Sequence, residues 1–155
     1  SCCVLFTYGK FEYLTCGDAG QNGKIEQPLA NALNMKIEAM KASHHMSVST
    51  QTPAAMAKYQ PQVIVTQSFY IRDEQPNVDV LKALYPSYLG DKYLYFTNID
   101  QSQQDAHEDV YGQAAGMNGH VVIRVAPGGD SFHVFMLDDT NFDYNVTYIK
   151  GFNCR

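Results

Sequence analysis

The chain has 155 residues, of which 45% are hydrophobic and 17% charged, and its formal net charge is -5. This composition is typical of a globular protein, and folding a chain of this length removes roughly 70% of its unfolded surface from water. The lysines and arginines are scattered singly and no apolar run reaches membrane-spanning length, which excludes a nucleic-acid-binding stripe and a transmembrane segment. We therefore expect one domain over residues 1–155 that acts on small molecules or protein partners.

The first residues predict a β-hairpin. Residues 2–8 and 11–16 are β-prone runs joined by Gly9-Lys10, a pair typical of a tight turn. The pattern starts at Ser1 with no leader and no initiator methionine, so we expect the later part of a larger protein, and the compartment stays undetermined.

The four cysteines do not suggest a zinc ribbon or a disulfide framework, because none of them forms a CxxC pair. We expect them to be buried free thiols. They are Cys2, Cys3, Cys16 and Cys154.

From residue 25 onward, helical and strand-like patterns alternate. Val63 to Thr66 is a continuous β-branched run, as in strands buried on both faces. Alternation of this kind predicts an α/β fold with a mixed sheet and helices on one face. The expected elements are helices over 25–34, 54–59 and 77–84, and strands over 37–42, 63–66 and 93–97.

The remainder of the chain has a different composition. Residues 98–118 are rich in glutamine, aspartate, glycine and asparagine, which indicates a long surface loop. Residues 119–126 and 131–137 alternate apolar with polar side chains around a Pro-Gly-Gly-Asp turn, which predicts a C-terminal β-hairpin. Residues 146–149 are a candidate edge strand.

Polar, ligand-type side chains follow two of the predicted strands. Asp18 follows the strand that ends at Cys16, and His44-His45 follow the strand over 37–42. Parallel strands deliver the residues after their carboxyl ends to one edge of a sheet, where such folds assemble sites. An alternative role for Asp18 is that of a turn residue, whose side chain hydrogen-bonds the nearby backbone. Adjacent histidines are harder to explain by packing, because buried imidazoles need partners for two nitrogens.

Other chemistries have weaker support. The chain has no P-loop, no GxSxG elbow and no dinucleotide-binding fingerprint. A nucleophilic pair of Cys16 with His44 is conceivable, since both follow strand ends. We expect the remaining histidines to be solvated or half-buried rather than ligands; they are His107, His120 and His133.

These segments together resemble a known family. The order "VLFTYGKFEYLTCGDAG", "KIEAMKASHHMS", "QVIVTQS" and "QPNVDVLKAL" is similar to the second half of the metallo-β-lactamase-fold hydrolases. It looks most like the branch that includes the soluble domain of competence-type DNA-internalisation proteins and their stand-alone relatives. The resemblance covers about residues 2 to 97.

The resemblance implies half of an αββα metallo-β-lactamase sandwich. It also implies a metal centre, of zinc or manganese, with Asp18 and His44 as ligands and His45 as a neighbour that could exchange roles or take part in catalysis. The implied function is hydrolysis of phosphodiester or related ester bonds by a metal-bound hydroxide. The family's His-x-His-x-Asp-His motif, which supplies most ligands, is absent from this chain.

Two departures from the family pattern lie beside the expected site. Met46 replaces a glycine of His-His-Gly-Ser, and Gln75 replaces the histidine of His-Pro. We therefore expect this fragment to be inactive alone and to hold metal weakly or not at all. The alternative is a non-catalytic binding or assembly module that kept the fold and lost the metal site. A half sandwich would also expose an apolar sheet face, which predicts a missing N-terminal half-domain or a homodimer as partner.

Overall fold

The structure, a computed structural model, describes residues 1–20, 24–68, 75–87 and 93–155. Its larger sheet has the spatial order β1-β2-β3-β4-β5-β6. β1 and β2 are antiparallel, and every later neighbour in this sheet is parallel. The strands are β1 (Val4–Tyr8), β2 (Phe11–Thr15), β3 (Ala39–Lys41), β4 (Val63–Thr66), β5 (Tyr93–Phe96) and β6 (Gly116–Met117).

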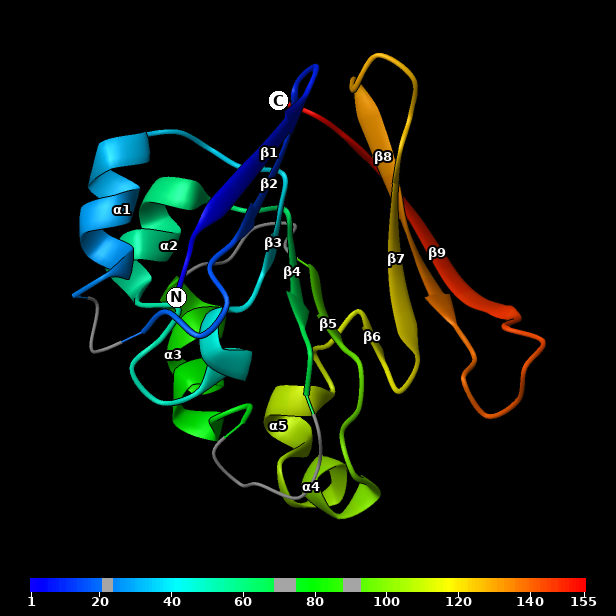
Figure 1. Cartoon of the computed structure of the whole chain (residues 1–155). Helices are drawn as coiled ribbons and strands as arrows, with labels where there is room; N and C mark the ends of the chain where they lie inside the picture. Colours follow the sequence, from blue (N-terminus) through cyan, green and yellow to red (C-terminus); the bar gives the residue numbers. More distant parts are fainter. Residues whose placement is uncertain (21–23, 69–74, 88–92) are drawn as a thin grey trace.

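Three helices cover one face of this sheet (Figure 1). They are α1 (Glu26–Leu33), α2 (Pro53–Tyr59) and α3 (Val78–Ser87). Thr52 caps α2, its side chain accepting a hydrogen bond from Ala55 N, and Pro53 occupies the first turn, where it needs no N–H partner. The core between helices and sheet is apolar and includes Leu14, Met40, Met46, Met56, Ile64, Leu81, Leu84 and Phe96.

A second, three-stranded antiparallel sheet covers the opposite face. It consists of β7 (His120–Val125), β8 (Ser131–Leu137) and β9 (Val146–Asn153). Its alternating pattern turns one row of side chains inward, and these form a second core with the larger sheet. That core contains Phe11, Ala39, Val63, Tyr95, Phe132, Val134 and Met136. The expectation of a bare apolar face is therefore wrong, because the C-terminal strands cover it.

The segment predicted as a long loop, residues 98–118, is largely ordered. It contains α4 (Gln101–Ala106), α5 (Glu108–Tyr111) and β6. Asp100 caps α4 by accepting a hydrogen bond from Ser102 N. Tyr111 is buried, with its ring centroid 5.6 Å from that of Phe96. The composition of this segment did not indicate these elements, because only a few apolar residues, such as Val110 and Tyr111, pack them into the core.

The carboxyl end of the chain ties the two sheets together. The Arg155 guanidinium donates to Ile37 O at 2.7 Å and to Gln60 O at 2.8 Å, and it pairs with the buried Glu38 carboxylate. These contacts lie at the amino ends of β3 and β4, beside the β1–β2 hairpin in Figure 1. They leave the opposite, carboxyl-terminal edge of the parallel strands open for a site.

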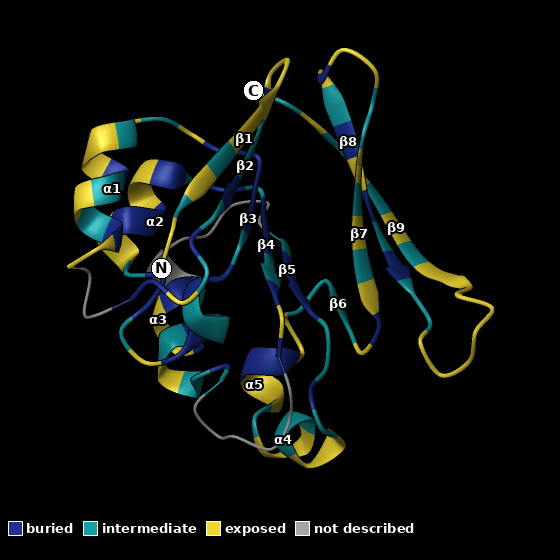
Figure 2. Cartoon of the chain, viewed as in Figure 1, coloured by how far each residue is buried: buried dark blue, intermediate teal, exposed yellow. Residues whose placement is uncertain are grey.

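The predicted α/β class is confirmed: a mixed sheet carries helices on one face, and the C-terminal hairpin is present and extended by β9. Figure 2 shows buried residues in the inner strands of the larger sheet and exposed ones along its edge strand β1, on the outer surfaces of the helices and on β7 and β9. Among the described helices, none is long and apolar enough to cross a membrane.

Candidate functional site

The carboxyl ends of β2, β3 and β4 bring three segments to one edge of the sheet. Asp18 follows β2, the short 3₁₀ helix η1 (Ser43–Met46) follows β3, and Gln67 follows β4. A hydrogen bond from His44 N to Gly17 O, 2.9 Å long, joins the first two segments. The sequence prediction that these residues meet at one edge agrees with this geometry.

Asp18 and His45 face each other at this edge. His45 Nε2 lies 3.5 Å from Asp18 Oδ1, and both side chains are partly exposed. The other ring nitrogen, Nδ1, lies 2.6 Å from Gln67 O. A carbonyl oxygen only accepts hydrogen bonds, so Nδ1 must carry a proton. Nε2 is then free to bind a proton or a metal ion opposite the carboxylate.

This arrangement matches the donor chemistry of a metal ligand. A metal-binding histidine usually donates its second ring N–H to a carbonyl or carboxylate, which fixes the tautomer and the ring orientation. Gln67 O plays that part for His45. Carboxylate oxygen and imidazole nitrogen are both ligands that zinc accepts. Asp18 and His45 thus fit two positions of a metal centre.

The sequence predicts Asp18 and His44 as ligands, with His45 as a neighbour that could exchange roles, and in the structure the His45 ring nitrogen lies near Asp18. The two imidazole centroids are 6.4 Å apart and the rings are tilted by 58°. Both residues and Met46 have positive φ values, from 46° to 60°, so the backbone turns left-handed through all three. This left-handed turn directs His45 toward the Asp18 carboxylate. The spacing of residues in the sequence does not show which of the two histidines points that way.

Sequence reasoning missed Lys41, which lies beside the pair. Its Nζ donates to Gly17 O at 3.2 Å and to Ala42 O at 3.0 Å. Burial lowers the pKa of Lys41, while the Asp18 carboxylate raises it. The sequence feature that could have pointed to Lys41 is its place as the last residue of an otherwise apolar strand.

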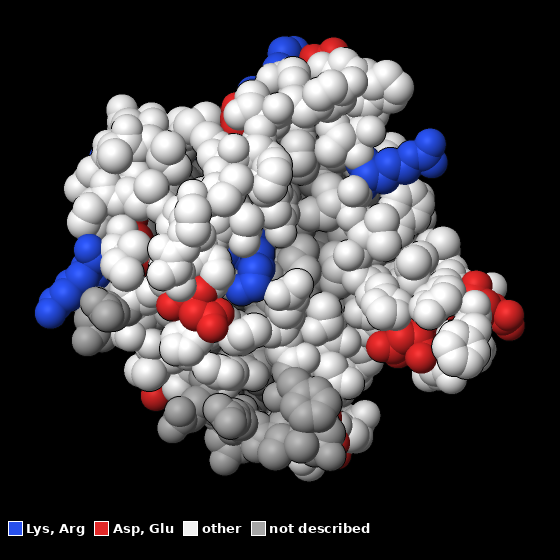
Figure 3. All heavy atoms as spheres, viewed as in Figure 1, with Lys and Arg blue, Asp and Glu red and all other residues white. Residues whose placement is uncertain are grey.

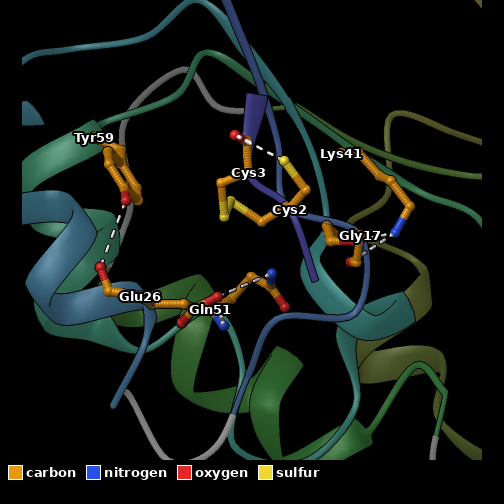
Figure 4. The surroundings of a disulfide bond; sticks show 9 residues. Cys2, Cys3, Gly17, Glu26, Lys41, Gln51 and Tyr59 are labelled. Carbon is orange, nitrogen blue, oxygen red and sulfur yellow. Dashed lines mark hydrogen bonds between the residues drawn. A yellow bond between two sulfur atoms is a disulfide. The ribbon is translucent and has the colours of Figure 1, made fainter. Parts of the chain in front are cut away.

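A disulfide joins Cys3 to Cys16, one residue before Gly17 (Figure 4). The expectation of free thiols is wrong for these two cysteines, because the β1–β2 pairing continues past the strand ends and brings them together. Cys2 and Cys154 are free, and Cys2 is exposed. The strand end that carries Asp18 is therefore anchored covalently.

Buried Glu26 fixes the loop that follows η1. Its carboxylate accepts hydrogen bonds from Gln51 N at 3.0 Å and Thr52 N at 3.1 Å, and Figure 4 shows it beside Gln51. Burial raises the pKa of Glu26, although the two N–H groups and the Ser43 side chain lower it.

Met46 does not crowd the site. Its side chain is fully buried in the core beneath the helices, and its sulfur lies 4.0 Å from Thr66 Oγ1. Gln75 is half-buried and precedes Pro76 through a cis peptide bond. Among the described residues, neither side chain has a hydrogen bond or ion pair with Asp18 or His45.

The other histidines have no hydrogen bond or ion pair with Asp18 or His45 in the described part of the chain. His120 and His133 are exposed on β7 and β8, and His107 is half-buried between α4 and α5. Within the described residues, no three histidine, cysteine, aspartate or glutamate side chains come together as a metal-binding group. On the face shown in Figure 3, lysine and arginine side chains are separate rather than gathered in a basic patch.

No protein-family model matches the chain, and no curated protein is significantly similar to it.

Proposed function

We propose that this chain is the C-terminal half of a metal-dependent hydrolase of the metallo-β-lactamase fold, acting on phosphodiester or related ester bonds. The proposal rests on one observation, the opposed Asp18 carboxylate and His45 Nε2 at the carboxyl edge of the parallel strands. It is supported by the Gln67 carbonyl, which holds His45 in the tautomer suited to ligation.

Asp18 and His45 would hold zinc or manganese, and the remaining ligands would come from groups outside the described residues. A divalent ion in such a centre acts as a Lewis acid on the ester and makes water more acidic. This chain contributes two ligands and the backbone contacts that orient them. By itself, it is not expected to turn over ester substrates efficiently.

The partner that completes the site would be an N-terminal half-domain or a second copy of the chain. The large sheet does not offer its inter-sheet face for this purpose, since β7–β9 pack on it. The open carboxyl-terminal edge, where Asp18 and His45 are partly exposed, is the place for the missing ligands.

Metal titration of the purified chain tests the proposal. After chelator treatment and desalting, zinc and manganese are titrated into the wild type and Asp18→Asn by calorimetry. We expect one bound ion per chain in the wild type and affinity at least about tenfold lower in Asp18→Asn. Asp139→Asn, a change in an exposed carboxylate after β8, is the matched control and should bind as the wild type does. Equal binding by Asp18→Asn and the wild type would overturn the proposal.

The second candidate is a non-catalytic binding or assembly module that kept the fold. It is favoured by Gln75, which stands where the family has a histidine, and by the lack of a three-residue ligand group in the described part of the chain. A chain that binds neither zinc nor manganese in this titration would support this candidate.

A further inference from the structure

A groove runs between the two sheets on the side nearest β1. Its volume is about 370 Å³, within the range of small-molecule sites. Its walls come from β1, β2 and β4 on the larger sheet and from β7 on the smaller one. The lining residues are Phe6, Phe11, Tyr13, Val65, Gln67, Val121, Ile123 and Val125.

Most side chains that line this inter-sheet groove are aliphatic or aromatic, and none of the lining residues is charged; Gln67 and Tyr13 add polar groups. Phe6 is 56% exposed, and its ring centroid lies 6.3 Å from that of Tyr13. On β7, the inward-facing residue Ile123 is half-buried in the groove, whereas its neighbour Val122 is exposed on the other face of the strand. Aromatic and branched side chains that stay accessible in a concave site favour a flat or branched apolar ligand.

One end of the groove adjoins the Asp18–His45 pair. Gln67 lines the groove, and its carbonyl oxygen accepts the His45 Nδ1 hydrogen bond. Val65 also lines the groove, and it is paired in register with Lys41 on β3. Residues paired in register point to the same face of a sheet, so the Lys41 side chain leaves the sheet beside Val65.

Lys41 supplies a cation at this junction. Two of its three N–H groups donate to Gly17 O and Ala42 O, and the third has no acceptor among the described residues. A ligand that fills the groove with an apolar group can therefore place an anionic group at the Lys41 ammonium.

We propose that the inter-sheet groove binds an amphipathic anion: its aromatic or branched apolar group lies against Phe6, Tyr13 and Ile123, and its anionic group lies at Lys41. Combined with the proposed function, on which this part rests, the substrate class is an ester that carries one apolar substituent. Its reacting group would extend from the groove to Asp18 and His45.

Two fluorescent probes of similar shape test the groove. 8-Anilinonaphthalene-1-sulfonate is anionic, and N-phenyl-1-naphthylamine is its uncharged counterpart. We expect both to bind the wild type at one site. Phe6→Ala should weaken both probes about fivefold or more, since it removes one aromatic wall. Phe142→Ala, a change in a phenylalanine that is 92% exposed away from the groove, should leave both unchanged.

The charge requirement is tested with Lys41→Met. We expect weaker binding of the sulfonate probe and unchanged binding of the uncharged one, while Lys58→Met, on the exposed surface of α2, changes neither. Ile123→Gln and its outward-facing control Val122→Gln give a second comparison, with thermal unfolding recorded for every variant. Equal effects of Phe6→Ala and Phe142→Ala, or a sulfonate affinity unchanged by Lys41→Met, would overturn the proposal.

These results are distinguishable from the metal experiment. Asp18→Asn should lose metal and retain the uncharged probe, because Asp18 does not line the groove. If probe binding depends on Phe6 but the chain binds no metal, the groove proposal is supported and the hydrolase proposal is overturned. If the chain binds metal but probe binding does not depend on the groove residues, the hydrolase proposal is supported and the groove proposal is overturned.

Discussion

His45 Nε2 lies 3.5 Å from Asp18 Oδ1, while His45 Nδ1 is bonded to Gln67 O. Two acceptor atoms at this separation attract a cation between them, and the carbonyl keeps the imidazole from turning away. The two residues are 27 positions apart in the sequence, and parallel strands bring them together at one edge.

The first prediction separates the two histidines. We expect His45→Asn to lower zinc affinity about tenfold or more, and His44→Asn to change it by less than about threefold, because His45 Nε2 lies 3.5 Å from Asp18 Oδ1. Asparagine tolerates the left-handed backbone at both positions. Calorimetric titration measures the affinities. A larger loss of zinc affinity in His44→Asn than in His45→Asn would make His44 the ligand. Unchanged affinity in both variants would show that neither histidine binds zinc.

The second prediction concerns Met46, which combines a buried side chain with φ of 60°. Met46→Ala should destabilise the fold by about 2–5 kcal/mol, as expected for loss of a buried methionine. Met46→Gly should be the milder change by about 1 kcal/mol, because glycine adopts positive φ without steric cost. Urea unfolding measures both. A glycine variant less stable than the alanine variant would show that the backbone at this position carries no strain.

The third prediction follows from Glu26, whose pKa is raised by burial. Between the ordinary glutamate pKa and the raised value, the folded state binds more protons than the unfolded state, so this group's contribution to stability falls as pH rises. Glu26→Gln removes the titration. The stability of the wild type relative to Glu26→Gln should therefore decrease as the pH rises from the ordinary glutamate pKa to the raised pKa of Glu26.

Urea unfolding at several pH values provides the measurement for Glu26. Glu108→Gln, a change on the exposed surface of α5, is the control for the general effect of removing a carboxylate. A difference between wild type and Glu26→Gln that is flat with pH, or that rises, would contradict the raised pKa.

The fourth prediction concerns the Cys3–Cys16 disulfide, which closes a loop with a sequence separation of 13. Cys3→Ser should lower the free energy of unfolding by about 3 kcal/mol under oxidising conditions. The wild type should lose a similar amount on reduction, and Cys3→Ser should be insensitive to reductant. Cys2→Ser, which removes the free exposed neighbour, should behave as the wild type does. A Cys2→Ser variant as unstable as Cys3→Ser would indicate a different pairing.

The metal titration and the unfolding series have independent readouts. Asp18 and His45 are partly exposed and make few core contacts, so their substitution should leave stability nearly unchanged. Met46, Glu26 and Cys16 are buried, so their substitution should mainly change the free energy of unfolding.

The sequence by itself determined the order and type of most elements and the edge at which the site residues gather. The β-branched run at 63–66 and the helical spacing after residue 25 are local patterns that specify buried strands and amphipathic helices. Parallel strands then place the residues after their carboxyl ends together, which is why Asp18 and the histidine pair could be chosen before the fold was known.

Only the tertiary structure decided the details that chemistry depends on. The positive φ values through η1 select His45 over His44 to face Asp18, and the extension of the β1–β2 pairing joins Cys3 to Cys16. Packing of β7–β9 on the large sheet covers the face expected to be bare and forms the inter-sheet groove. Side-chain direction, strand register and layer packing arise from contacts between distant parts of the chain, and no local pattern in the sequence encodes them.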